Sequence, residues 1–513
     1  MAAYRAVLVT VKETSTTGWI CLPGQEEPVA LADPFIRVQM RQAYLDRGEE
    51  LERVFYGLSN RTSPDFWLVV SPPGLGKSWF LRQLAARAES AATDWVTSLI
   101  DLRVDAGRDR SAITIICSLF SLAEPQSSGR EDDVLVVAQS IIRAGRSHLC
   151  LLDSAELLAW TTVTQLRDYL GKIYRLIQDA RSTGARLAFV VASRRDDGWR
   201  GITPYPRLSV LSLGGVRLSA IQNSLDGLAH HMRVVHSPAE LRENAELVQR
   251  VTDGVPALVQ QSLQWMQEEE WLAIGRLDNP QFFNKIIAPY IRNHLLVPDS
   301  LLPREEGQPE KTAPRLLVLL GALRALVPYR FFTLYHIRHH LDDDSSFKDA
   351  LNEANWSIDD LWQAISDMAL LYRPLDEAWQ EIHPAIRRLL YRYFYEPEER
   401  AEAHLRARNF TKAWADRLTG KEQVIVMVES IWHEAARLRL SSGATFREDL
   451  IGLTRMQSLA VRSSFNSMIE LRNYAAQRMR NDDELQREVA HDGGLFDKLV
   501  QVVLTPEAQG NLT

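Results

Sequence analysis

The chain has 513 residues, of which 46% are hydrophobic and 24% charged, and its formal net charge is −7. This length predicts two to four domains, and the balance of apolar and charged residues excludes a generally disordered protein. The net negative charge excludes a global basic field that would draw the chain to nucleic acid or anionic lipid.

The first part of the chain predicts strands that alternate with helices. Residues 1–33 predict a short β segment, and residues 34–58 carry apolar side chains at helical spacing. Between residues 66 and 213, apolar runs alternate with helical patterns, and the predicted strands are 66–71, 95–102, 148–153, 186–193 and 208–213. This alternation indicates an α/β domain over residues 34–215, in which helices cover both faces of a parallel sheet.

The rest of the chain predicts helices. Within it, two short strand-like pieces, Leu370–Tyr372 and Trp379–Ile382, precede a closing helix, and this order is typical of a winged-helix domain. A stretch rich in proline and charge indicates a linker. The predicted parts are a helical lid domain (216–296), a linker (297–315), a winged-helix domain (316–396) and a C-terminal all-α region (397–513).

Residues 71–78, Ser-Pro-Pro-Gly-Leu-Gly-Lys-Ser, lie between a predicted strand and a predicted helix. They match the P-loop template Gly-x-x-x-x-Gly-Lys-[Ser/Thr], except that Ser71 replaces the first glycine. In such a loop, backbone N–H groups surround the phosphates, Lys77 neutralises phosphate charge and the hydroxyl of Ser78 is offered to Mg²⁺. The alternative is a chance proline-glycine loop before a helix. The motif predicts ATP or ADP with Mg²⁺ as ligands, and the binding residues are Pro73, Gly74, Leu75, Gly76, Lys77, Ser78 and Trp79.

Two acids follow the predicted strand 148–153. Asp153 ends that strand, where P-loop folds hold the magnesium ion and its water shell. Glu156 lies three residues later and is a candidate for orienting or deprotonating the attacking water. The alternative for Glu156 is an acid of a first helical turn, favoured there by the helix dipole. With Lys77, these residues predict a slow, regulatory ATPase.

Arg194 follows the predicted strand 186–193 and is the third catalytic candidate. An arginine at this strand end can reach a γ-phosphate and report its presence. The alternative is a solvated arginine in the charged run Arg194–Asp197.

Together these motifs resemble the STAND class of signal-transducing P-loop ATPases, which are NLR-like relatives of the AAA+ group. The Asp153–Glu156 segment matches the Walker B pattern of that class, and Ser193 with Arg194 matches the end of its fourth strand. A Gly-x-Pro motif in the helical lid corresponds to Gly254–Pro256, and the histidine of the winged helix to His383.

The resemblance covers roughly residues 40–396 and is closer to bacterial winged-helix members than to animal ones. It implies that Pro256 and His383 contact bound nucleotide, that ADP holds a closed form, and that ATP allows opening and homo-oligomerisation. The residues leave simpler roles open, since Pro256 also suits the first turn of a helix and His383 a buried or capping position. Pro384 follows His383 where plant-type members usually have aspartate, and residues 46–54 are similar to the entry segment of the fold with altered order.

The resemblance implies a regulatory switch that acts through an effector or sensor protein, with bacterial antiviral defence or signalling as its setting. An origin-recognition-type AAA+ protein that binds DNA is the first alternative. Acidic pairs such as Asp359 and Asp360 in the winged-helix stretch make nucleic acid the less expected partner. The second alternative is a scaffold that nucleotide stabilises without turnover, for which Ser71 is the argument.

The three cysteines, Cys21, Cys117 and Cys150, form no Cys-x-x-Cys pair, so we expect neither a zinc ribbon nor a disulfide framework. The sequence has no signal-peptide pattern and no apolar run long enough to span a membrane. These observations predict a cytoplasmic protein.

Overall fold

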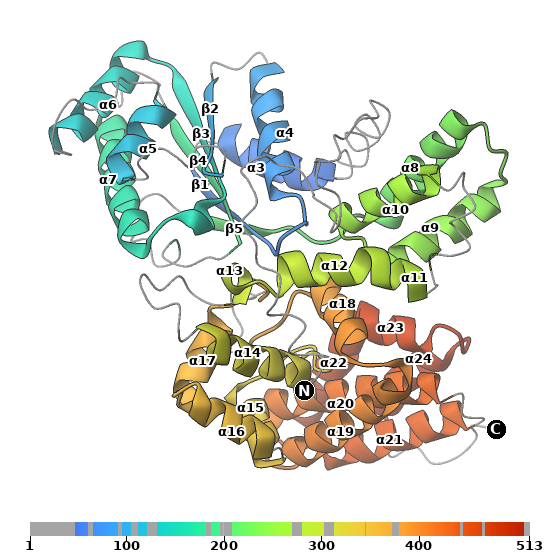
Figure 1. Ribbon diagram of the computed structural model, residues 1–513. Coiled ribbons are helices and arrows are strands. Elements are labelled where there is room, and N and C mark those ends of the chain that lie inside the picture. Colours follow the sequence, from blue (N-terminus) through green and yellow to red (C-terminus); the bar gives the residue numbers. More distant parts are fainter. Residues whose placement is uncertain are drawn as a thin grey trace. The chain divides into compact units, whose positions relative to one another are not determined.

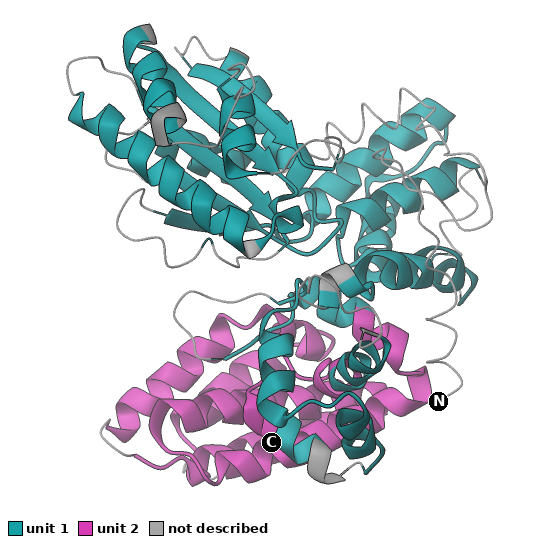
Figure 2. Ribbon diagram, turned by 60° about the vertical axis from the view of Figure 1, so that its left-hand side comes forward, with its two compact units in different colours: residues 1–322, 337–389 teal, residues 323–336, 390–513 magenta. Residues whose placement is uncertain are grey.

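The computed structural model describes residues 47–59, 65–90, 95–103, 111–120, 131–180, 186–194, 199, 208–268, 277, 280–301, 312–343, 345–371, 379–441, 445–463 and 467–506. The chain divides into two compact units (Figure 2). Unit 1 comprises residues 1–322 and 337–389, and unit 2 comprises residues 323–336 and 390–513. The predicted β segment 1–33 lies outside the described residues.

Unit 1 contains a five-stranded parallel sheet with the order β2-β3-β4-β1-β5 (Figure 1). All neighbouring strands are parallel, as the alternating pattern predicted. The strands are β1 (Phe66–Val70), β2 (Trp95–Asp101), β3 (Ser147–Asp153), β4 (Leu187–Ser193) and β5 (Leu208–Ser212). Each lies within one residue of its predicted limits, and the prediction of an α/β P-loop fold is confirmed.

Helices cover both faces of this sheet because successive strand residues point to opposite sides. On one face, Trp67 and Val69 pack with α3 (Gly48–Ser59) and α4 (Lys77–Ser90). On the other, Phe66 and Leu68 belong to the core formed with α5 (Ala112–Leu119), α6 (Glu131–Ala144) and α7 (Trp160–Asp179). Figure 1 shows these two groups of helices on either side of the sheet.

A helical region follows β5, as predicted. It begins with α8 (Leu218–Met232), α9 (Pro238–Thr252) and α10 (Pro256–Glu268). Ser237 and Glu240 form a capping box that starts α9. Residues 280–295 then run through α11 (Pro280–Phe282), η4 (Phe283–Ile287), α12 (Ala288–Tyr290) and η5 (Ile291–Leu295), and both η4 and η5 are π-helical.

The next segment has the predicted order of helices, paired strand-like pieces and a closing helix. Its helices are α13 (Pro298–Leu301), α14 (Thr312–Leu326), α15 (Leu334–Asp343), α16 (Ser345–Glu353), α17 (Ile358–Ser366) and α18 (Pro384–Phe394). Leu371 and Ile382 form an antiparallel bridge before α18. The predicted linker is helical at both ends, in α13 and at the start of α14, while residues 302–311 lie outside the described part. The limits of the individual domains stay predictions.

The C-terminal part of unit 2 is all-α, as predicted. Its helices are α19 (Pro397–Ala415), α20 (Gly420–Leu440), α21 (Phe446–Ala460), α22 (Met468–Arg480), α23 (Asp483–Val489) and α24 (Leu495–Leu504). Helix α20 is buried around most of its circumference, so it is the central helix of the bundle. Trp432 on α20 is buried and belongs to the core of this bundle.

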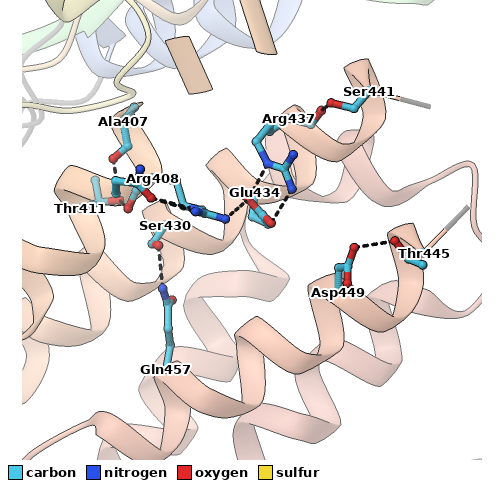
Figure 3. Close-up of polar contacts among 11 residues, drawn as sticks. Ala407, Arg408, Thr411, Ser430, Glu434, Arg437, Ser441, Thr445, Asp449 and Gln457 are labelled. Atoms are coloured by element: carbon cyan, nitrogen blue, oxygen red, sulfur yellow. Dashed lines mark hydrogen bonds and ion pairs between the residues drawn. The ribbon is translucent and has the colours of Figure 1, made fainter. Parts of the chain in front are cut away.

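Polar side chains on α20 are paired within the bundle (Figure 3). Glu434 accepts hydrogen bonds from Arg408 at 2.9 Å and from Arg437 at 2.8 and 2.9 Å. The side-chain amide of Gln457 donates to the hydroxyl of Ser430 over 2.7 Å. None of the described helices combines the length and hydrophobicity that crossing a membrane requires.

Candidate nucleotide-binding site

The sheet topology brings the predicted site residues to one edge. Strand β4 lies between β1 and β3, and all three are parallel, so the segments after Val70, Asp153 and Ser193 emerge side by side. The N–H of Ser71 donates to the carbonyl of Ser193 over 3.4 Å, which joins the start of the P-loop to the end of β4.

The P-loop needs glycine at two of its positions. Gly74 has a φ of 78° and Gly76 a φ of 92°, in the left-handed region that favours glycine. Ser71 does not belong to the residues with positive φ, so its backbone accepts a side chain where the template has glycine. The departure at Ser71 therefore leaves the shape of the loop intact.

The ammonium group of Lys77 is buried and faces its own loop. It donates to the carbonyl of Pro72 over 3.1 Å and to that of Ser71. Burial lowers the pKa of Lys77 to about 8, with smaller effects from surrounding charges. An anion bound beside this ammonium would favour its charged form, so the residue fits a phosphate ligand.

Asp153 and Ser78 provide hard oxygen atoms at the same edge. Asp153 is 3% exposed, and its carboxylate accepts hydrogen bonds from the side chain of Ser78 and, over 2.8 Å, from the N–H of Ser154. Burial raises the pKa of Asp153, and the neighbouring Asp101 acts in the same direction. A divalent cation would offset this buried negative charge, and hydroxyl and carboxylate oxygens suit Mg²⁺. The two residues thus fit the predicted ion.

Two arginines, one after each of the strands that flank β3, hold the carboxylate of Glu156, and we call this arrangement the arginine clamp. Its carboxylate lies 3.0 Å from the side-chain Nε of Arg194 and accepts a hydrogen bond from the backbone N–H of Arg194 over 3.1 Å. Arg103, which follows β2, approaches the carboxylate to 3.4 Å. Burial acts to raise the pKa of Glu156, but the charges of Arg194 and Lys77 outweigh it and keep the pKa below its usual value. In this state the acid is ionised and engaged with cations.

The Gly254–Pro256 motif lies against the P-loop. The carbonyl of Gly254 accepts the N–H of Val216 over 2.7 Å, and a side chain at Gly254 would collide with that same segment. Pro256 is the first residue of α10, and the N–H of Ala257 donates to the carbonyl of Gly74 over 3.4 Å. Pro256 thus combines the favourable first-turn position with a place beside the phosphate loop.

His383 and Arg388, from the predicted winged-helix segment, lie in the same part of unit 1. His383 is buried, and its ring is hydrogen-bonded to the backbone of Leu213, directly after β5. Burial, with Arg388 as a second cause, lowers the pKa of His383 to about 4, so the imidazole is neutral at pH 7. Arg388 on α18 forms an ion pair with Asp253, the residue before Gly254.

Tyr290 and His294, from the helix 280–295, complete this edge. The hydroxyl of Tyr290 donates to the carbonyl of Pro73 over 2.8 Å. The ring of His294 lies 5.4 Å from that of Tyr290, and burial with the charges of Arg194 and Arg103 lowers its pKa to about 4. Trp79 is half-buried in the first turn of α4.

Comparison with known proteins adds structural likeness alone. No protein-family model matches the sequence, and no curated protein matches it. Among solved structures, the Walker-type ATPase of Pyrococcus abyssi is 14% identical, covers 67% of this chain and 95% of its own, and has a TM-score of 0.41. Cdc6p of Pyrobaculum aerophilum is 18% identical over 72% of this chain and 95% of its own, with a TM-score of 0.28. The ORC1 protein of Aeropyrum pernix in complex with DNA is 14% identical, covers 67% of this chain and 91% of its own, and has a TM-score of 0.32.

These identities and TM-scores carry no conclusion about the activity of this chain. The assignment of the fold rests on the parallel sheet and on the loop after β1, and the STAND subclass stays a prediction. The DNA in the Aeropyrum complex belongs to that protein, and the expectation that nucleic acid is an unlikely partner here gains no support from the comparison.

Sequence reasoning missed Arg103, Tyr290, His294 and the Asp253–Arg388 pair. Of these residues, only Arg103 was predictable from the sequence. It follows a predicted parallel strand, and residues at the C-terminal ends of adjacent parallel strands lie at the same edge of the sheet. Tyr290 is 217 positions from Pro73 and carries no motif that would connect the two.

Proposed function

We propose that this chain is an ATP- and ADP-binding regulatory switch that hydrolyses ATP slowly and acts through a partner protein. The observation that carries the proposal is the clamp on Glu156 by Arg194 and Arg103, at the edge where Lys77, Ser78 and Asp153 meet. An acid held between two cations cannot accept a proton readily, which suits an ATPase that rests until it is released.

The residues divide the chemistry as follows. Backbone N–H groups of Gly74 to Ser78 surround the phosphates, and the ammonium of Lys77 leaves its loop carbonyls to face phosphate oxygens. Ser78 and Asp153 would hold a magnesium ion, which would supply neutralisation of charge on the phosphates. Glu156 orients the attacking water once Arg194 turns from it to the γ-phosphate.

The contacts from the winged-helix segment support a closed, ADP-holding state. Arg388 is paired with Asp253 beside the Gly254–Pro256 motif, and His383 contacts the backbone after β5. These contacts tie the segment to two elements beside the phosphate loop, so ATP exchange is expected to loosen them. The opened chain would then homo-oligomerise and engage an effector, in a setting of bacterial antiviral defence or signalling.

Thermal unfolding with ADP–Mg²⁺, with ATP–Mg²⁺ and without nucleotide tests the proposal, with Lys77→Ala as the control variant. A nucleotide at about a hundred times its Kd should add roughly 2.7 kcal/mol of stability to the wild type and none to the variant. If nucleotide shifts the unfolding temperature of neither protein, and denaturation releases no co-purified nucleotide, the proposal fails.

Two further measurements separate the alternatives. Glu156→Gln should leave ADP binding unchanged and abolish hydrolysis, whereas a wild type that binds without turnover is a nucleotide-stabilised scaffold. A salt-dependent gel shift tests the origin-recognition alternative, because binding through phosphate contacts weakens steeply with salt. The acidic start of α17, with Asp359 and Asp360, favours the protein partner.

A further inference from the structure

Tyr290, on the helix of residues 280–295, contacts the phosphate loop. Tyr290 is 4% exposed, and its hydroxyl donates to the carbonyl of Pro73. A side chain at Gly74 would collide with the same hydroxyl, so the ring lies directly against the loop. Burial raises the pKa of Tyr290, and the hydroxyl therefore remains a neutral donor.

The composition of the loop makes the orientation of Gly74 critical. Pro72 and Pro73 have no N–H, and the N–H of Ser71 is bonded to Ser193. Gly74 is therefore the first residue of the loop whose N–H is available for a phosphate. A planar trans peptide holds the C=O of Pro73 and the N–H of Gly74 in opposite directions. A donor that holds this carbonyl outside the loop also sets the direction of the Gly74 N–H.

The next peptide of the loop, between Gly74 and Leu75, is held in the same way by the start of α10. The carbonyl of Gly74 accepts the N–H of Ala257, so the direction of the Leu75 N–H is tied to the start of α10. Two successive phosphate donors are thus oriented by partners outside the loop. The tyrosine lies between two π-helical turns, η4 and η5, an irregularity that often marks functional positions.

We infer that Tyr290 is a positioning residue for the phosphate grip, by which we mean the phosphate-binding loop of residues 71–78. Its hydroxyl aligns the N–H of Gly74 with bound phosphate. The inference rests on the proposed nucleotide binding. His294, one turn further along, lies beside Tyr290, and the charge of Arg194 acts on its ring. Loosening of this helix would release the carbonyl of Pro73 and so weaken phosphate binding by the loop.

The experiment uses the full chain and measures affinity for ADP–Mg²⁺ and for inorganic pyrophosphate, in competition with a fluorescent ADP analogue. Tyr290→Phe keeps the ring and removes the hydroxyl. We expect both affinities to fall about five- to tenfold, the size of one lost hydrogen bond. The equal loss for pyrophosphate would place the effect on the phosphate grip rather than on the base.

The matched control is Tyr395→Phe in unit 2, which removes a hydroxyl bonded to the carbonyl of Arg324 over the same 2.8 Å. It should lower the unfolding temperature without changing either affinity. A Tyr290→Phe affinity within twofold of wild type overturns the inference, as does a loss confined to ADP. Tyr290→Met is a second variant that lacks the hydroxyl. It allows the same test if Tyr290→Phe does not fold.

Failure of the inference and failure of the proposed function are distinguishable. If the wild type binds ADP and Lys77→Ala does not, nucleotide binding stands and the Tyr290 variants alone decide the inference. If the wild type binds neither ADP nor pyrophosphate, both are overturned.

Discussion

Unit 1 and unit 2 each bury a cationic side chain, Lys77 and Arg330, and the two cations differ in their partners. In unit 2, Arg330 lies against Glu429 at 2.7 Å and Asp482 at 2.6 Å, and its guanidinium is 4.7 Å from the ring of Trp432. In unit 1, the ammonium of Lys77 faces two backbone carbonyls, and no carboxylate of the described residues lies within hydrogen-bonding distance of it.

The difference separates a charge that is paired within the fold from one that we propose meets a ligand. A buried charge in water-free surroundings is costly unless an opposite charge and hydrogen bonds compensate it. Glu429 and Asp482 hold the pKa of Arg330 above its usual value despite burial. Lys77 has its pKa lowered instead, mainly by burial, which is consistent with the proposed role of this residue in phosphate binding.

The largest expected effect is on unit 2. Arg330→Met should destabilise it by about 3–5 kcal/mol, because two buried carboxylates lose their cation. Calorimetric unfolding measures this, and ADP binding by unit 1 should not change. In the control Arg439→Met, an exposed pair with Glu488 is lost, and the change should stay within about 1 kcal/mol. Equal effects of the two variants would contradict the structural role of the Arg330 network.

Replacing Lys77 is expected to change stability in the opposite direction. Without nucleotide at pH 7, Lys77→Met should stabilise unit 1 by about 1–3 kcal/mol, because it removes a buried charge. The folded-state pKa of Lys77 is about 8, below its ordinary value of 10.5, so the unfolded chain binds more protons between these two values. Wild-type stability therefore rises with pH across that window, and the advantage of the variant shrinks from pH 8 upward.

Urea unfolding at pH 7 and pH 10, followed by the signal of unit 1, measures this difference. The exposed Lys412→Met serves as control and should show no dependence of this kind. A Lys77→Met protein that is less stable than wild type at pH 7 would mean that the ammonium is a structural donor to its loop.

A smaller effect is expected at the arginine clamp. Arg103 is half-exposed, and Arg103→Ala should raise the rate of ATP hydrolysis about two- to fivefold by loosening Glu156. Steady-state release of phosphate measures the rate, and Arg82→Ala, whose side chain is similarly exposed near Asp101, is the control. A fall in the rate would instead assign Arg103 to the phosphates.

The smallest effect compares one serine in each unit. The buried hydroxyl of Ser71 has no hydrogen-bond partner among the residues that the structure describes, whereas the hydroxyl of Ser430 accepts from Gln457 (Figure 3). Ser71→Ala should therefore stabilise the protein by up to about 1 kcal/mol, and Ser430→Ala should destabilise it by about 1 kcal/mol. Denaturant unfolding measures both, and destabilisation by Ser71→Ala would point to a hidden partner.

The sequence by itself determined the parts of the site that depend on local pattern. The strands were predictable from apolar runs, and the P-loop from the spacing of Gly74, Gly76, Lys77 and Ser78 after β1. Asp153 was predictable because a polar residue at the end of a buried parallel strand emerges at the sheet edge. The roles assigned to these residues stay predictions, and so does the part played by Pro256 and His383.

The tertiary structure alone decided how the charges are balanced. The clamp on Glu156 joins the ends of three strands, and the hydroxyl of Tyr290 meets Pro73 across 217 positions of sequence. Likewise, the burial of Arg330 beside Glu429 and Asp482 follows from packing between distant helices. Periodicity and motifs report which face of an element is apolar and which loop binds an anion. The partner of a buried charge or carbonyl depends on long-range packing, which local pattern does not encode.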